Sequence, residues 1–521
     1  MNPALVGFFW PTAIFVVLLR SGDYPITSIE ALIAFGIVGL VGALLGLLLN
    51  RFGGGVRKIA YAGLLTFMCN ALYRPYPELQ VFGASTDLVI PVLIFAGAIS
   101  IITLFRSDAD TLVATVLGAA FIGAFFTTPL YDDSWTFESE LLPPVAQAGL
   151  PPYIHIVLDG HLGFEQLPNI SLEGKADKSR YLDLYLSRGF YVHGNVYVNY
   201  TNTNHSFSNF LSYGETIRPP KPVESKDFAR HNLLLNPNNL FASLRSRGYK
   251  LSVVRSTHLD LCSDNEGRGI VDKCNVYPFS PLTDSIVGSN LPIRRKVAFL
   301  INNIFQRTGI VALVNRVADT NFGQAWGLPT WPFRTCLHCI SSETALATVV
   351  ESLPNLKPGH ALFLHLILPH GPFQTYDAHC TPRILPSYNP GAPTNYIKLY
   401  MGQVECTQRT IISFIDLLMT TEIGNKSFVV IHGDHGVRNR EINVSAQPLN
   451  LDEFDVTTDK LGKAAHSTFV AVRSPKRQPY YSNKLISLNE ALSDVVNELS
   501  RSNQYPQNSV EARVESLLRT K

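Results

Sequence analysis

Residues 153–161 read YIHIVLDGH, a nearly continuous apolar run that ends at an acidic residue, Asp159. Residues 428–436 repeat the pattern as FVVIHGDHG, where Asp434 and His435 follow the apolar run. Strands that are apolar along most of their length are typical of parallel sheets with both faces covered by helices. Because ligands of such sheets gather beyond the carboxyl ends of the strands, the two stretches predict a polar site at one sheet edge.

Short apolar runs alternate with helical patterns along residues 151–500. We expect strands at 153–158, 251–254, 361–368, 428–431 and 468–472, and helices near 178–188, 240–247, 343–353 and 396–419. This alternation predicts an α/β domain with a mostly parallel central sheet. The polar stretch 441–463 is expected to be a loop, and residues 501–521 a polar tail.

Five apolar runs precede this domain, at 3–19, 26–49, 59–73, 88–105 and 111–126. About 20 residues of helix cross the hydrocarbon core of a membrane. We therefore expect an N-terminal α-helical transmembrane bundle of about five helices in residues 1–126, followed by a linker at 127–150. The third run is short and carries Asn70, so a packed or re-entrant segment is the alternative there.

The charges of the loops predict an orientation. Basic residues between the second and third runs and between the fourth and fifth runs are Arg51, Arg57, Lys58 and Arg106. The positive-inside rule then places the N-terminus inside and the chain after residue 126 outside, although Arg20 and Arg74 oppose this bias. The net charge is only +2 and no basic cluster is present, so we expect no nucleic-acid partner.

Cysteine usage agrees with an exported domain. Cys69 lies in an apolar run, and the other six cysteines fall in the soluble part: Cys262, Cys274, Cys336, Cys339, Cys380 and Cys406. An even set in an exported domain predicts up to three disulfides. Proximity favours 262 with 274 and 336 with 339, which leaves 380 with 406. A zinc site at Cys336-Leu-His-Cys339 is the alternative for that pair.

The residues at the strand ends suit a divalent cation. An Asp-His pair flanked by glycines lets the backbone turn both ligands inward, as Asp434 and His435 do in this pattern. Asp159 taken alone has a second interpretation, a helix N-cap. Finding such residues at both strand ends favours the metal site.

Five motifs in this order resemble the alkaline phosphatase/sulfatase superfamily over roughly residues 150–500. They are Leu-Asp159-Gly, Asn199-Tyr-Thr-Asn-Thr203-Asn-His-Ser206, Leu-His365 with His370-Gly-Pro372, Gly-Asp434-His435-Gly and a late His466. With the apolar runs in front, the layout is similar to lipoteichoic acid synthases and lipid A phosphoethanolamine transferases. That resemblance implies a multi-pass protein of the bacterial inner membrane with its catalytic domain in the periplasm.

The resemblance also implies roles for individual residues. Thr203 matches the nucleophile at the start of a helix, where a metal ion and the helix N-terminus would favour an alkoxide; capping of the helix is its alternative role. The implied ligands of one or two Zn²⁺ or Mn²⁺ ions are Asp159, Thr203, Asp434, His435 and His466. Substrate contacts are expected from His370, Arg438, His205 and His161.

His370 has three possible roles by this resemblance: it binds substrate phosphate, binds a second metal, or protonates the leaving group. His365 lies inside an apolar run, so we expect it to be a satisfied core histidine.

Two departures from the family narrow the chemistry. Sulfatases carry Cys or Ser within a Cys/Ser-x-Pro-x-Arg motif, whereas this chain has Thr203-Asn-His205-Ser-Phe207. Sulfate-ester hydrolysis through a converted Cys or Ser is therefore disfavoured. The first acidic ligand of the transferases is usually Glu, and Asp159 resembles sulfatases and phosphodiesterases instead.

We therefore expect a metal-dependent phospho-group transferase that acts through a phospho-threonine, with a membrane lipid donor and a glycan or lipid acceptor. The alternative is a hydrolase of the same fold, a phosphodiesterase or a sulfatase, acting on an envelope glycan. A non-catalytic envelope assembly protein is the third interpretation.

Overall fold

The structure is a computed structural model. It describes residues 3–21, 24–52, 54–73, 80–81, 84–104, 109–124, 141–143, 149–171, 173–212, 221–222, 233–234, 238–263, 269–277, 291–307, 314, 336–371, 373, 375–376, 379–380, 382–383, 393–437, 460–475 and 477–502. The chain forms two compact units. The first contains Met1–Ser134, Ser280–Thr344 and Gly371–Gly402, and the second Trp135–Phe279, Ala345–His370 and Gln403–Lys521.

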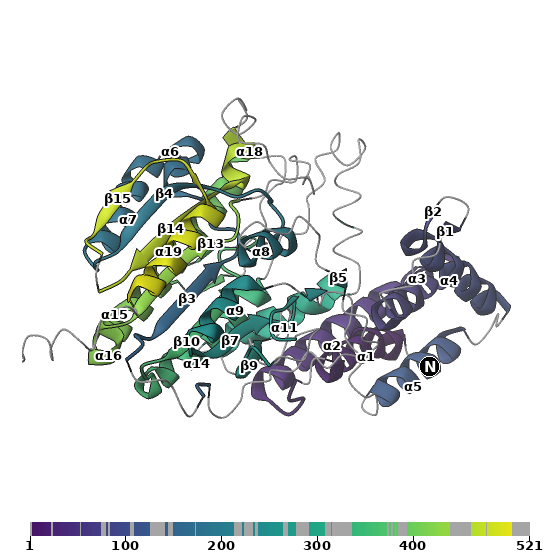
Figure 1. Ribbon diagram of the computed structural model, residues 1–521. Coiled ribbons are helices and arrows are strands. Elements are labelled where there is room, and N and C mark those ends of the chain that lie inside the picture. The colour runs from purple at the N-terminus through teal and green to yellow at the C-terminus, as the bar shows by residue number, and fades with distance from the viewer. Residues whose placement is uncertain are drawn as a thin grey trace, which may run out of the picture. The chain divides into compact units, whose positions relative to one another are not determined.

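In the first unit, each of the five predicted apolar runs contains a helix (Figure 1). These are α1 (Pro3–Ser21), α2 (Ile29–Leu49), α3 (Gly54–Tyr73), α4 (Thr86–Leu104) and α5 (Ala109–Ala124). A short hairpin, β1 (Gln80–Val81) and β2 (Ala84–Ser85), precedes α4. Within the described residues, two helical segments, Pro3–Arg20 and Ile29–Leu49, are long and apolar enough to cross a membrane. The chain thus begins with two apolar helices of spanning length, and five spans stay a prediction.

Glycines explain how closely α1 and α2 pack. A Cβ atom added to Gly7 would lie 2.1 Å from the carbonyl oxygen of Gly42, and one added to Gly46 would lie 2.2 Å from that of Pro3. Small residues four apart let two helix backbones approach in this way, as in membrane helix pairs. The helix α11 (Ile293–Arg307) also packs on α2 and adds Val297 to the same apolar core.

The second unit is built on a nine-stranded sheet in the order β15-β4-β14-β13-β3-β10-β7-β9, with β16 paired to β4 (Figure 1). The strands are β3 (Tyr153–Leu158), β4 (Tyr191–Tyr197), β7 (Lys250–Ser256), β9 (Lys273–Tyr277), β10 (His360–Leu366), β13 (Phe428–Gly433), β14 (Ser467–Arg473), β15 (Tyr480–Ser482) and β16 (Ile486–Ser487). Only β14 runs antiparallel to its neighbours, β13 and β4. The predicted α/β domain with a mostly parallel sheet is confirmed.

The predicted helices of this domain are present, with shifted ends. They are α7 (Gly174–Leu186), α9 (Asn239–Ser246), α14 (Leu337–Ser352) and α15 (Pro393–Met419), joined by α6 (Leu167–Ile170), α8 (Thr203–Leu211), α16 (Glu422–Asn425), α18 (Lys460–Ala465) and α19 (Leu488–Ser502). Two 3-10 turns are Phe164–Gln166 and Leu353–Asn355. Short strands outside the main sheet are β5 (Lys221–Pro222), β6 (Leu233–Leu234), β8 (Leu259–Asp260), β11 (Thr375–Tyr376) and β12 (Pro382–Arg383).

The structure corrects some details and leaves others outside the described residues. The predicted loop 441–463 is wrong at its end, because α18 begins at Lys460; residues 441–459 are not among those described. The tail begins later than expected, since α19 continues to Ser502. Strand β4 was not predicted, because its polar Asn195 and its Gly194 interrupt the apolar pattern. Most of the linker 127–150 lies outside the described residues.

One face of the sheet carries an apolar cluster of buried residues. It contains Tyr153 and Val157 of β3, Val430 of β13, and Phe207 and Phe210 of α8. The helices α9 and α19 contribute to the same core. Helix α8 is thereby held against the carboxyl ends of β3 and β13, where the predicted site lies.

Candidate active site

The two acidic strand ends lie side by side. Strands β3 and β13 are parallel neighbours, and Leu158 pairs with Gly433, so Asp159 and Asp434 follow paired positions. Gly160 has φ +79°, a conformation that disfavours any residue with a Cβ atom, and its N–H donates to Oδ1 of Asp434 at 2.9 Å. The glycine after Asp159 therefore turns the backbone so that it holds the second carboxylate.

Asp159 does not cap a helix. The next helical turn along the chain is Phe164–Gln166, and its N-cap is Gly163. The N-cap interpretation of Asp159 is thus wrong. Its side chain is 2% exposed and lies among the polar groups of the site.

Thr203 is the first residue of α8 and points into the same group. Its Oγ1 lies 3.3 Å from Oδ2 of Asp159 and 3.3 Å from Nε2 of His435. The N-cap of α8 is Asn202, whose side chain accepts the N–H of Asn204 at 3.0 Å. The hydroxyl of Thr203 is therefore not the cap, which removes the alternative role considered for it.

The separations within this group fit a metal ion. Ligand atoms of Asp159, Asp434 and His435 all lie within 4.8 Å of one another. Nε2 of His435 is 3.6 Å from a carboxylate oxygen of Asp159 and 3.6 Å from one of Asp434. Tetrahedral coordination with bonds of about 2.1 Å places ligand atoms about 3.4 Å apart, close to these distances. Two carboxylates, an imidazole and a hydroxyl are a donor set that Zn²⁺ or Mn²⁺ accepts.

The charges around Asp159 keep it ionised. Burial alone would raise the pKa of its carboxyl, but His370, His365 and His435 together hold that pKa well below its usual range. An ionised carboxylate is the form that binds a cation.

His365 is a site residue that the sequence reasoning missed. It is fully buried, as expected, but its Nε2 lies 3.6 Å from Oδ2 of Asp159. Among the described residues its ring nitrogens have no polar partner other than Asp159, so the structure places this buried histidine in the site and not in a purely structural core position. The available signal was the motif that combines Leu-His365 with His370-Gly-Pro372. The pairing of β10 with β3 then sets His365 opposite Val157, two residues before Asp159.

His370 reaches the site from the segment after β10. A Cβ atom added to Gly160 would lie 3.8 Å from Cα of His370 and 3.9 Å from Cε1 of His435, so these two histidines flank Gly160. The carbonyl oxygen of His370 accepts a hydrogen bond from Nε2 of Gln403 at 2.8 Å. The backbone of His370 is thus held beside the predicted metal ligands.

The structure does not test the predicted roles of His161 and His466. His161 is fully buried, and its Nδ1 and Nε2 are hydrogen-bonded to the carbonyl oxygen of Leu162 and to Gln408. That is the arrangement of a packed structural histidine, and substrate contact by His161 stays a prediction. The Nδ1 atom of His466 bonds to the carbonyl oxygen of Val198 at 2.9 Å, which leaves only its Nε2 for a ligand.

His205 lies on α8 two residues after Thr203, with its ring 5.6 Å from that of Tyr200. Burial lowers the pKa of His205 below its ordinary value. Its substrate contact, like the ligand role of His466, stays a prediction. Arg438 lies outside the described residues.

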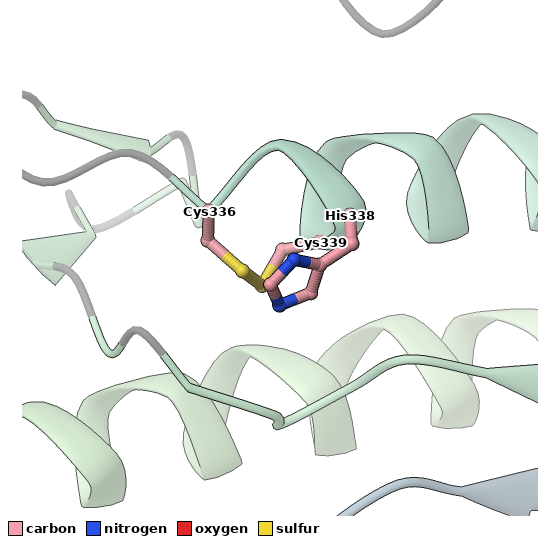
Figure 2. Close-up of side chains that lie close together, drawn as sticks. All are labelled: Cys336, His338 and Cys339. Atoms are coloured by element: carbon pink, nitrogen blue, oxygen red, sulfur yellow. A yellow bond between two sulfur atoms is a disulfide. The ribbon is translucent and has the colours of Figure 1, made fainter. Parts of the chain in front are cut away.

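A second cluster of metal-binding residue types lies in the other unit. Figure 2 shows the imidazole of His338 beside a disulfide between Cys336 and Cys339 at the start of α14. The predicted pair is confirmed, and because the two sulfur atoms are bonded to each other, the zinc alternative would need reduction first. The pair Cys262–Cys274 is also confirmed, Cys380 and Cys406 are both disulfide-bonded, and Cys69 is free.

The profile of the Sulfatase family matches residues 153–460, more than half of the chain. The chain belongs to this family and is a sulfatase-like enzyme. Members of the family typically bind a divalent metal, and the Asp/His cluster is a possible site for one.

Several solved structures are similar to this chain at low sequence identity. The phosphonate monoester hydrolase of Agrobacterium radiobacter has a TM-score of 0.40 and 10% identity, covering 67% of this chain and 74% of its own. The lipoteichoic acid synthase LtaP from Listeria monocytogenes has a TM-score of 0.36 and 12% identity, with coverage of 70% and 76%. A putative sulfatase from Bacteroides thetaiotaomicron has a TM-score of 0.36 and 13% identity, with coverage of 67% and 71%. No curated protein matches the chain.

Proposed function

We propose that this enzyme is a membrane-bound, metal-dependent phospho-group transferase that acts on an envelope lipid or glycan through a phospho-threonine intermediate. The observation that carries the proposal is the position of Thr203. Its hydroxyl stands at the N-terminus of α8 and lies 3.3 Å from both Asp159 and His435. No Cys or Ser for conversion to an aldehyde occupies this position, so a hydroxyl nucleophile is the chemistry that the site supports.

The first step forms a bond between Oγ1 of Thr203 and the phosphorus of a phosphodiester, and breaks the bond from phosphorus to the leaving alcohol. The N-terminus of α8 favours the negative charge that develops at Thr203. A divalent ion held by Asp159, Asp434 and His435 would lower the pKa of the Thr203 hydroxyl and neutralise phosphate oxygens. In this proposal His370, whose backbone lies beside Gly160, would protonate the leaving oxygen.

In the second step the hydroxyl of an acceptor attacks the phospho-threonine, and Oγ1 of Thr203 leaves. The acceptor would be a glycan or a lipid. Water as the acceptor would make the protein a hydrolase of the same fold, which is the competing function. The two functions share the first step and differ only in the molecule that takes the phospho group.

The N-terminal unit supports a lipid donor. Helix α2 is long and apolar enough to span a membrane. Its outward-facing Leu40 and Leu44 are 62% and 52% exposed. Apolar side chains on the outside of such a helix are stable in lipid. Confinement of enzyme and donor to one surface raises their effective concentration. We infer a multi-pass location in a bacterial inner membrane, with the catalytic domain, which carries the disulfide Cys262–Cys274, in the periplasm.

The test is intact-mass analysis of the full chain in detergent after incubation with Mn²⁺ or Zn²⁺ and vesicles of phosphatidylglycerol or phosphatidylethanolamine. The wild type should gain the mass of one phosphorylated headgroup, and Thr203→Ala should not. Thr201→Ala is a matched control, because Thr201 is a buried threonine just before α8 whose side chain makes no hydrogen bond to Asp159 or His435 among the described residues. Retention of full turnover by Thr203→Ala would overturn the mechanism.

The acceptor is decided by the fate of the headgroup. Transfer predicts that labelled headgroup appears on an added glycan or lipid acceptor. Hydrolysis predicts that it appears in water at the same rate with or without acceptor.

A further inference from the structure

A chain of hydrogen bonds lies inside the sheet next to the site. Oη of Tyr153 is 2.7 Å from Nδ1 of His155, and Nε2 of His155 is 2.7 Å from Nε2 of His432. Nδ1 of His432 is then 3.0 Å from the carbonyl oxygen of Gly433. Tyr153 is 1% exposed and the two histidines are fully buried, so this is a polar chain inside the apolar core.

The chemistry of the last acceptor sets the direction of the whole chain. A carbonyl oxygen only accepts, so Nδ1 of His432 carries the proton. In a neutral imidazole Nε2 of His432 is then an acceptor, and His155 must donate from its own Nε2. This leaves Nδ1 of His155 as an acceptor for the hydroxyl of Tyr153. Each neutral histidine therefore has one permitted tautomer.

The surroundings favour neutral histidines. Both histidines are fully buried, and burial lowers the pKa of His155 well below its ordinary value. The ring of Phe363 lies 4.9 Å from that of His155, and the ring of Phe210 lies 5.1 Å from that of His432. In apolar surroundings a buried polar group without its hydrogen bond is costly. The loss of any one of these hydrogen bonds would therefore destabilise the fold.

The bond between His155 and His432 joins the two strands that carry the site. His155 lies on β3, four residues before Asp159, and His432 lies on β13, two residues before Asp434. The chain also ends on the peptide of Gly433, from which Asp434 continues. It thus acts on the relative position of β3 and β13 and on the backbone just before the second carboxylate.

Close packing of the core does not by itself require the polar atoms of Tyr153, His155 and His432. Apolar side chains of similar size often stabilise a core as well as a buried polar network does, and buried networks can instead select one geometry. A chain with a single direction, placed between two strands with acidic ends, is suited to that second role.

We propose that Tyr153, His155 and His432 are positioning residues that hold the strand ends of Asp159 and Asp434 in the geometry for cation binding. This inference rests on the proposed function, because it assumes that those carboxylates bind a metal. Groups that orient the ligands of a metal typically change its affinity 10- to 100-fold when they are removed.

The first test is the tautomeric state of the metal-free full chain in detergent, measured by solid-state NMR with ¹⁵N-labelled histidine. His155 should be protonated at Nε2 and His432 at Nδ1, assigned by loss of each signal in the matching variant. The opposite tautomer at either residue would overturn the inference.

The second test compares His155→Gln with His155→Leu. Glutamine keeps an N–H near the position of Nε2, whereas leucine fills the space without a donor. His155→Leu should weaken Zn²⁺ binding by about tenfold or more and shift the ¹⁵N signals of His435 in the metal-free protein. His155→Gln should restore most of both properties. Equal effects of the two variants, or none, would show a purely structural role.

Tyr153→Phe keeps the test decisive if His155→Leu fails to fold, because it removes only one hydroxyl. It should leave the tautomer of His155 unchanged, because the carbonyl oxygen of Gly433 sets the direction of the hydrogen bonds, and it should weaken Zn²⁺ binding less than tenfold; a change of that tautomer would count against the inference. If the wild-type protein binds neither Zn²⁺ nor Mn²⁺, the proposed function fails. The positioning role is then tested separately in the metal-free variants. It is supported if His155→Leu shifts the ¹⁵N signals of His435 and His155→Gln restores them, and it fails if neither variant changes them.

Discussion

Oγ1 of Thr203 and Nε2 of His435 lie 3.3 Å apart, although 232 positions separate the two residues in the chain. The contact brings the start of α8 to the end of β13 and leaves Asp159 within 3.3 Å of the same hydroxyl. A hydroxyl held between a carboxylate and an imidazole, at a helix N-terminus, is arranged for activation as a nucleophile.

Substitution of the nucleophile should separate chemistry from folding. We expect Thr203→Ala to lower turnover of a phosphodiester by at least about 1,000-fold, because the substitution removes the attacking oxygen. Thr203→Ser keeps a hydroxyl and should retain measurable turnover. Steady-state kinetics of the two variants at saturating metal provide the measurement, and equal loss in both would argue that Thr203 only packs the helix.

Removal of one carboxylate should weaken metal binding. Asp434→Asn replaces a charged ligand by a neutral one, so we expect the dissociation constant for Zn²⁺ to rise by more than about tenfold. Competition with a chelator measures this constant. Asp416→Asn is the matched control, because Asp416 is half exposed on α15 and pairs with Arg188 away from the site. The same loss in the control would point to a general effect of charge.

Removal of the metal should lower stability. A ligand that binds only the folded state at about 100 times its dissociation constant stabilises that state by about 2.7 kcal/mol. Treatment with a chelator should therefore lower the thermal unfolding midpoint of the wild type, and added Zn²⁺ or Mn²⁺ should restore it. Asp434→Asn should show a smaller shift in the same scan, and an equal shift would place the bound metal elsewhere.

Acidification should destabilise the catalytic domain between about pH 6.5 and pH 4. Burial lowers the pKa of His161 and of His432 to about 4, so the unfolded chain binds more protons than the folded one in this range. The stabilisation is complete above the unfolded value and falls as pH decreases, by about 3 kcal/mol for each histidine near pH 4. Urea unfolding at several pH values measures the slope, and a stability that does not change between pH 6.5 and pH 4 would contradict the prediction.

The glycine after the Asp-His pair should tolerate no side chain. A Cβ atom on Gly436 would lie 1.7 Å from the carbonyl oxygen of Ala464, so Gly436→Ala should destabilise the domain by at least about 2 kcal/mol and weaken metal binding. Gly402→Ala is the control, since it lies within α15 with no atom in the space of the added Cβ. That change should stabilise the helix by up to about 1 kcal/mol, as measured by denaturant unfolding.

The local pattern of the sequence was sufficient for much of the fold and for the centre of the site. Runs of Val, Ile and Leu that end in a carboxylate predicted β3 and β13 with Asp159 and Asp434 at their ends. The reason is that a buried strand must be apolar, whereas the residues that follow it can be polar. The antiparallel direction of β14 was not available in this way, since a buried strand has the same composition in either direction. Strand β4 was missed because its pattern is interrupted by Gly194 and Asn195.

Only the tertiary structure decided the roles of the histidines. Four histidines lie in or beside apolar runs, and the local sequence does not distinguish their roles: His155, His161, His365 and His432. The fold pairs His155 with His432 across 277 positions, bonds His161 to Gln408 across 247, and sets His365 beside Asp159. The reason is physical: a side chain's hydrogen-bond partner is set by strand order and register, which are properties of the assembled sheet and not of any single segment.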